Sequence, residues 1–171
     1  MASVGHIAVG LAAARISRPG GVPRVWPMAG WSVLSLLPDA DVVGFSLGVR
    51  YAAPWGHRGA THSLLFALAL GLTIGWVAWM RKRPVLRTGL IAVAVLASHA
   101  ILDTMTDGGL GCALWWPFDG TRYFAPWRLI PVAPIGLRFW SPSGASVALI
   151  ELALFCPLVL FALWPWRATK A

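Results

Sequence analysis

The stretch Thr61–Met80, THSLLFALALGLTIGWVAWM, decides the fold of this chain. A helix of about 20 apolar residues crosses the hydrocarbon core of a bilayer, and no acidic residue, lysine or arginine interrupts this one. Ser146–Trp166 is a second apolar run, with Glu151 as its single charged residue. In the whole chain 58% of residues are hydrophobic and 12% are charged, whereas soluble domains are about 25% charged. We therefore interpret the chain as a polytopic membrane protein.

Three shorter apolar segments complete the predicted architecture: Ala2–Ile16, Val25–Leu37 and Thr88–Leu102. Together the segments predict an all-α integral membrane bundle of about five helices, with one long outer loop over Asp107–Ala145. The range is four to five, because a helix over Ala2–Ile16 is only about 22 Å long. Residues 1–171 suit a single domain, and the sequence contains no internal repeat.

Basic residues orient the predicted helices. They gather in three regions, which the positive-inside rule assigns to the cytoplasm: Arg15, Arg18 and Arg24; Arg81, Lys82, Arg83 and Arg87; Arg167 and Lys170. The N-terminus, Val42–Ala60 and the long loop then face outward, and the C-terminus is cytoplasmic. Since much of the formal charge of +8 orients the helices in this way, we expect no nucleic-acid partner.

Acids and histidines are few, and threading the chain brings them to the outer helix ends. Ionisable groups beside hydrocarbon usually pair with one another or mark a function. Four histidines and several carboxylates at one level have a cation as their natural common partner. The candidate metal ligands are His6, Asp39, Asp41, His57, His62, His99, Asp103 and Glu151.

Local spacing supports this metal site. His99 and Asp103 are spaced i, i+4 and project from one helix face. Asp39 and Asp41 follow Pro38, so we expect the helix to break there and an irregular turn to present two carboxylates. Gly56 and Gly59 flank His57-Arg58 and predict a bend with room for a substrate or an ion. Mixed imidazole and carboxylate ligands suit one or two zinc ions, and also manganese or ferrous iron.

Other interpretations stay open for three acids. Glu151 is either a ligand or a structural partner of an arginine. Asp107 either binds the metal or caps the turn before Gly108-Gly109, and Asp119 in Phe-Asp-Gly is expected to be a turn residue.

Several of these strings are similar to a known family. Leu36–Asp41 (LLPDAD), Gly56–Ser63 (GHRGATHS), Ser98-His99 with Asp103 and Thr106, and Trp116-Pro117 resemble the LexA-regulated, inner-membrane-associated predicted metal-dependent hydrolases, the YdjM-like family. The match runs from His6 to about Pro131. The resemblance implies an inner-membrane location and metal-dependent hydrolysis. Where this chain has Asp107 the family usually has proline.

The ligand order also looks like that of the zinc-dependent phospholipase C and single-strand nuclease superfamily. This resemblance implies a helical enzyme with a zinc cluster, an N-terminal histidine and a His-x-x-x-Asp helix. The superfamily's last His-x-x-x-Glu/Asp helix has no full counterpart here, because Val147 stands four residues before Glu151.

These features predict a phosphoester hydrolase that acts on a lipid or lipid-linked phosphate through metal-activated water, at a site open to the headgroup layer. Arg58 is the candidate for binding a phosphate oxygen, and Asp39 or Asp41 for orienting the water. Arg122 and Arg128 are expected to hold the distal headgroup or to anchor the loop in lipid. Thr61, Ser63 and Ser98 are expected to cap helices or to hydrogen-bond the ligand histidines.

Two other functions remain open. A non-catalytic metal-binding membrane protein, either a transporter or a sensor, is the main alternative. A metalloprotease ranks below it, because the sequence lacks His-Glu-x-x-His.

Overall fold

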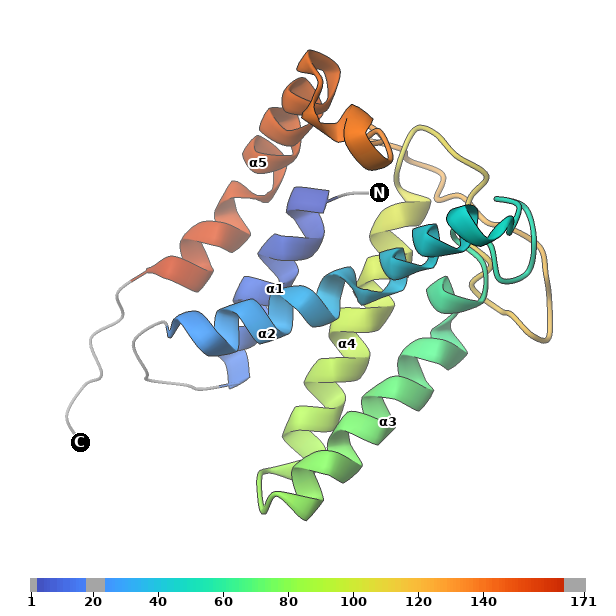
Figure 1. Cartoon of the computed structure of the whole chain (residues 1–171). Helices are drawn as coiled ribbons and strands as arrows, with labels where there is room; N and C mark the ends of the chain where they lie inside the picture. The colour runs from blue at the N-terminus through green and yellow to red at the C-terminus, as the bar shows by residue number, and fades with distance from the viewer. Residues whose placement is uncertain (1–2, 18–23, 165–171) are drawn as a thin grey trace.

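Five α-helices form the bundle in a computed structural model that describes residues 3–17 and 24–164 (Figure 1). Within these ranges the chain is all-helical and contains no β-strand, as predicted. Three 3₁₀ helices and a long loop between α4 and α5 complete it. The elements are α1 (Ser3–Ser17), α2 (Val25–Leu36), η1 (Leu37–Leu47), η2 (Ala60–His62), α3 (Leu64–Met80), α4 (Val85–Thr104), η3 (Gly136–Trp140) and α5 (Pro142–Leu163).

Two of the described helices, α4 and α5, are long and apolar enough to cross a membrane. The helices α1 and α3 are apolar but shorter. Within the predicted span Thr61–Met80, the helix α3 has 17 residues, which is at the short end of the range of about 17–25 that crosses a bilayer. His62 closes η2 instead, and the Ser63 hydroxyl accepts a hydrogen bond from Phe66 N at 3.0 Å, which fixes the start of α3.

Small residues let neighbouring helices approach closely, as is common in membrane bundles. The helices α3 and α4 form a hairpin (Figure 1). A Cβ atom added at Gly71 would lie 2.3 Å from Val93 Cγ2, so the hairpin tolerates only glycine there. At the crossing of α1 and α2, a Cβ atom at Gly10 would lie 2.4 Å from the Ser32 Cα atom.

The α-helix ends just before Pro38, as predicted, but the segment that presents Asp39 and Asp41 is a 3₁₀ helix rather than an irregular turn. Pro38 lies in the first turn of η1, where proline's missing N–H costs nothing. The chain therefore continues from α2 into η1 without interruption, and Figure 1 shows the two as one rod that runs across α4. Gly48, with φ of 80°, ends it. This rod carries Asp39 to the end of α4.

Candidate metal centre

Four side chains from three elements bring their donor atoms to one point. Asp39 comes from η1, His62 from η2, and His99 and Asp103 from α4. The His62 and His99 Nε2 atoms are 3.1 Å apart, and each is 3.5 Å from Asp39 Oδ1. Asp103 Oδ2 lies 3.6 Å from His62 Nε2. We call these four residues the metal cluster.

These distances fit a single divalent cation. Donors placed 2.0–2.2 Å from a tetrahedral ion are separated from one another by about 3.3–3.6 Å, and the donor atoms of the metal cluster all lie within 4.8 Å of one another. Neither carboxylate oxygen of Asp39 has a hydrogen-bond partner among the described residues, although the side chain is only 6% exposed. A buried carboxylate of this kind needs a compensating positive charge.

Hydrogen bonds at the far side of each ring direct both histidines into the cluster. His99 Nδ1 lies 2.7 Å from the Ser35 carbonyl oxygen, which can only accept, so Nδ1 carries the proton. His62 Nδ1 lies 3.0 Å from Thr61 Oγ1 and 3.3 Å from Asp41 Oδ2. Both Nε2 atoms therefore point at the site, as in metal centres whose ligands are oriented by outer hydrogen bonds.

Asp41 and His57 form a layer behind the cluster. Asp41 Oδ1 lies 2.7 Å from His57 Nδ1, and its Oδ2 accepts from the Thr61 hydroxyl at 2.8 Å. Asp41, His57 and His62 make a second group of donors that shares His62 with the metal cluster. Burial alone raises the pKa of Asp41, but the hydrogen bonds from His57 and His62 outweigh it and lower the pKa to about 2. Asp41 is therefore ionised and already well supplied with donors.

Asp103 is held from two sides. The Nε2 atom of His6 lies 3.2 Å from Asp103 Oδ1, and the His6 ring stacks on His99 with centroids 3.7 Å apart. Arg58 Nε lies 3.0 Å from Asp103 Oδ2, and Arg58 Nη1 donates to the Gly108 carbonyl at 2.8 Å. Arg58 is fully buried and has a left-handed φ of 64°. The predicted neighbourhood of His6, Arg58, His99 and Asp103 is thus assembled by packing between α1, α4 and the loop before η2.

Glycines wind that loop tightly around Arg58. A Cβ atom at Gly59 would lie 2.2 Å from the Pro54 carbonyl oxygen, and one at Gly56 would lie 2.2 Å from that of Arg50. The prediction that Gly56 and Gly59 leave room for a substrate was therefore wrong, because backbone fills that space.

The cluster is buried rather than open to solvent, which corrects a second prediction. The side chains of His62, His99 and Asp103 are 0% exposed. Burial alone lowers the pKa of His62, but Asp103, Asp39 and Asp41 outweigh it and raise the pKa to about 10. The site thus concentrates negative charge at a buried point and attracts positive charge there.

Comparison with known proteins now places the chain. The family model of the YdjM inner membrane protein matches residues 1–169. The chain belongs to this family. It is also 42% identical, over 141 residues, to the inner membrane protein YbcI of Escherichia coli (strain K12), an alignment that covers 79% of this chain and 80% of that protein. No solved structure matches the chain significantly.

In this YdjM-family chain, Glu151 does not belong to the metal cluster. Its Oε2 atom accepts from the backbone N–H groups of Val4 at 2.7 Å and Gly5 at 3.2 Å. The carboxylate therefore satisfies the first turn of α1, where the helix dipole favours negative charge. This contact is neither of the two predicted for Glu151, which were a metal ligand and a structural partner of an arginine. No sequence signal shows it, since 146 residues separate Glu151 from Gly5.

Two of the predicted substrate arginines make contacts within the loop region. Arg122 donates to three backbone carbonyls, those of His57, Tyr51 and Ala53, at 2.8–3.2 Å. It thereby clamps the segment that carries His57. Arg128 lies over the Phe124 ring, 4.4 Å from its centroid.

The structure also shows the hydrogen bonds of the other polar residues to which the sequence assigned a role. Thr61 Oγ1 lies 3.0 Å from His62 Nδ1, and Ser63 caps α3, as expected. Ser98 instead donates to Val95 O in its own helix. Asp119 Oδ1 accepts from Thr121 N at 2.8 Å and is a turn residue, and Asp107 Oδ1 accepts from Val132 N.

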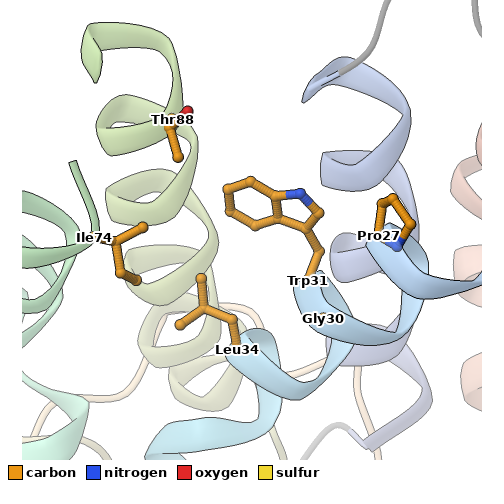
Figure 2. Close-up of a pocket in the computed structure, with 6 residues that line it drawn as sticks. All are labelled: Pro27, Gly30, Trp31, Leu34, Ile74 and Thr88. Carbon is orange, nitrogen blue, oxygen red and sulfur yellow. The ribbon is translucent and has the colours of Figure 1, made fainter. Parts of the chain in front are cut away.

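An apolar pocket of about 340 Å³ between α2, α3 and α4 lies apart from this chemistry (Figure 2). Figure 2 shows the Trp31 indole across from Ile74, with Leu34 below and Thr88 above. None of its lining residues is acidic or basic: Pro27, Gly30, Trp31, Leu34, Ile74 and Thr88. It provides no ligand for a metal.

Proposed function

We propose that this YdjM-family protein is a membrane-embedded metal-dependent hydrolase that cleaves a phosphoester of a lipid or lipid-linked substrate. The observation that carries the proposal is the convergence of Asp39, His62, His99 and Asp103 donor atoms within 4.8 Å. Zinc is the proposed ion, and manganese and ferrous iron suit the same donors. One ion is expected, because the second donor group shares His62 and its Asp41 is already hydrogen-bonded.

The surrounding residues supply orientation and charge. When bound, a divalent cation polarises the ester and lowers the pKa of water. Asp41 holds His62 and His57 in place, and His6 holds Asp103. The Arg58 Nη2 atom has no hydrogen-bond partner among the described residues and lies on a side chain that already contacts Asp103. Arg58 is therefore the proposed donor to a phosphate oxygen.

A lipid substrate follows from the location. The family is one of inner membrane proteins, and α4, which carries His99 and Asp103, is itself long and apolar enough to cross a membrane. Arg128, beside Phe124, is proposed to contact the distal headgroup. Arg122 can do so only if it gives up backbone carbonyls that it now binds.

Metal analysis and hydrolysis together test this proposal. Detergent-purified protein is expected to retain about one divalent ion per chain and to hydrolyse bis-p-nitrophenyl phosphate or a phospholipid. Asp39→Asn and His99→Ala are expected to lose both properties. Asp119→Asn is the matched control, because Asp119 is a turn residue of the long loop.

A non-catalytic metal-binding protein is the second candidate, and burial favours it. Sites in which protein donors fill all four positions of an ion are usually structural, whereas catalytic sites keep one position open. If the metal is retained but a broad panel of phosphoesters and acyl esters is not hydrolysed, this second function replaces the first.

A further inference from the structure

A second cavity lies between α1 and α4. Its volume is about 480 Å³. The cavity, which we call the α1–α4 groove, is lined mainly by Val9, Ala13, Leu90, Ala94, Ser98 and Leu158. The Ser98 hydroxyl already donates to Val95 O at 2.8 Å, so the groove offers water few partners.

The groove runs along α4 toward the end of that helix, which carries His99 and Asp103. At one end His6 of α1 contacts Asp103 of α4, and at the other Arg87 of α4 donates to the Ile16 carbonyl, so the two helices are antiparallel. The groove follows α4 from Leu90 to Ser98, roughly 12 Å of helix. Ser98 immediately precedes His99, and Val9 lies about one turn from His6.

Small side chains create the space. Ala13 and Ala94 stand where larger residues would close the gap between the helices, and Ala94 is exposed at the groove's rim. Because α4 is long and apolar enough to span the membrane, this opening faces hydrocarbon, where the molecules available to fill it are lipid chains.

We propose that the α1–α4 groove binds one apolar chain of a lipid and so places the headgroup of that lipid at the metal cluster. This inference rests on the proposed function and narrows its substrate. The substrate is a phosphoester with at least one long hydrocarbon chain, rather than a water-soluble phosphate. The chain supplies apolar contact area along α4. The headgroup lies at the end of the groove nearest His99, where the buried stack of His6 on His99 must open for it to reach the metal cluster.

A binding measurement tests the groove without requiring catalysis. Native mass spectrometry of the detergent-purified full chain, titrated with palmitoyl lysophosphatidylglycerol, is expected to show one tightly bound molecule. Ala94→Trp fills the groove and is expected to weaken that binding about tenfold, since several methylene groups lose their contacts. Ala69→Trp, at an exposed alanine of α3, is the matched control and is expected to bind like the natural chain. If Ala94→Trp fails to fold, the smaller Ala94→Leu takes its place, with a proportionately smaller loss.

An activity measurement separates this inference from the proposed function. For Ala94→Trp, the ratio of kcat/KM for a long-chain phosphodiester to that for a short-chain one is expected to fall about tenfold. Lipid binding that is equal in the natural chain and in both Ala94 variants overturns the groove proposal. If the Ala94 variants lose lipid binding but no form of the protein hydrolyses a phosphoester, the groove remains a lipid site and the hydrolase proposal fails.

Discussion

The Nε2 atoms of His62 and His99 face each other at 3.1 Å, while the Nδ1 atom of each ring is engaged on the opposite side. His62 belongs to η2 and His99 to α4, and the two residues are 37 positions apart in the sequence. Without an ion, the raised pKa of His62 keeps a proton on its Nε2, which donates to the His99 Nε2, and a bound cation would take the place of that proton. The arrangement therefore depends on the outer hydrogen bonds as much as on the donors.

Asp41→Asn is expected to weaken metal binding roughly 10- to 100-fold, the usual effect of losing an outer hydrogen-bond partner. An amide N–H₂ group cannot accept from His57, His62 and the Thr61 hydroxyl as the carboxylate does. Competition with a chromogenic chelator measures the affinity. An affinity equal to that of the natural chain would contradict the orienting role.

Arg58→Met is expected to destabilise the fold by about 3–5 kcal/mol, because it leaves the buried Asp103 carboxylate without its guanidinium. Thermal unfolding in detergent measures the loss. Arg58→Lys keeps a charge but loses the planar fork that also reaches the Gly108 carbonyl, so it should recover only part of the stability. Full recovery by lysine would show that charge alone matters.

Glu151→Leu is expected to cost roughly 1–3 kcal/mol, since the N–H groups of Val4 and Gly5 lose their acceptor in a buried place. Glu151→Gln retains an acceptor oxygen and should cost less. The readout is thermal unfolding combined with metal content. If Glu151 were a ligand instead, the glutamine variant would lose the ion without a comparable loss of stability.

A pair of glycine substitutions tests the helix packing. In Gly30→Ala the new Cβ atom meets nothing within 4 Å, so the variant is expected to stabilise α2 by about 0.5–1 kcal/mol. In Gly71→Ala the Cβ atom would lie 2.3 Å from Val93 Cγ2, so the α3–α4 hairpin must separate and stability should fall. Equal melting temperatures for both variants would contradict this packing.

Orientation has its own prediction. A fluorescent protein fused after Ala171 is expected to report a cytoplasmic C-terminus, as the basic residues indicate. Cysteine placed at Gly120, which has open space around it, is expected to react with an impermeant maleimide from outside the cell. The natural chain provides the background labelling. A protected Gly120→Cys in intact cells would reverse the predicted topology.

Sequence reasoning found the helices and all four residues of the metal cluster among its candidate ligands, because both leave signals in the sequence. Apolar length marks a membrane helix, and the i, i+4 spacing of His99 and Asp103 holds along a single helix. Asp39 and His62 were found because ionisable residues are rare in this chain, so each one carries information.

The rest depended on contacts between distant segments. Nothing near Ser35 shows that its carbonyl fixes His99, because every residue has a carbonyl. Arg58 is buried because the backbone of its own loop packs closely at Gly56 and Gly59. Pro38 allows a 3₁₀ helix to follow α2 because it falls in the first turn of η1 rather than in its interior. Both outcomes follow from the packed structure and not from the residue type.

The contact between Glu151 and the start of α1 also sets an order of assembly. A ribosome makes α1 first and α5 last, so the opening N–H groups of the first helix wait for their acceptor until nearly the whole chain has been synthesised. His6 lies in that first turn and contacts Asp103. The four residues of the metal cluster all precede α5, but the support that His6 gives to Asp103 is fixed only once α5 has packed against α1. A truncated chain lacking α5 is therefore expected to reach the membrane yet bind its ion more weakly.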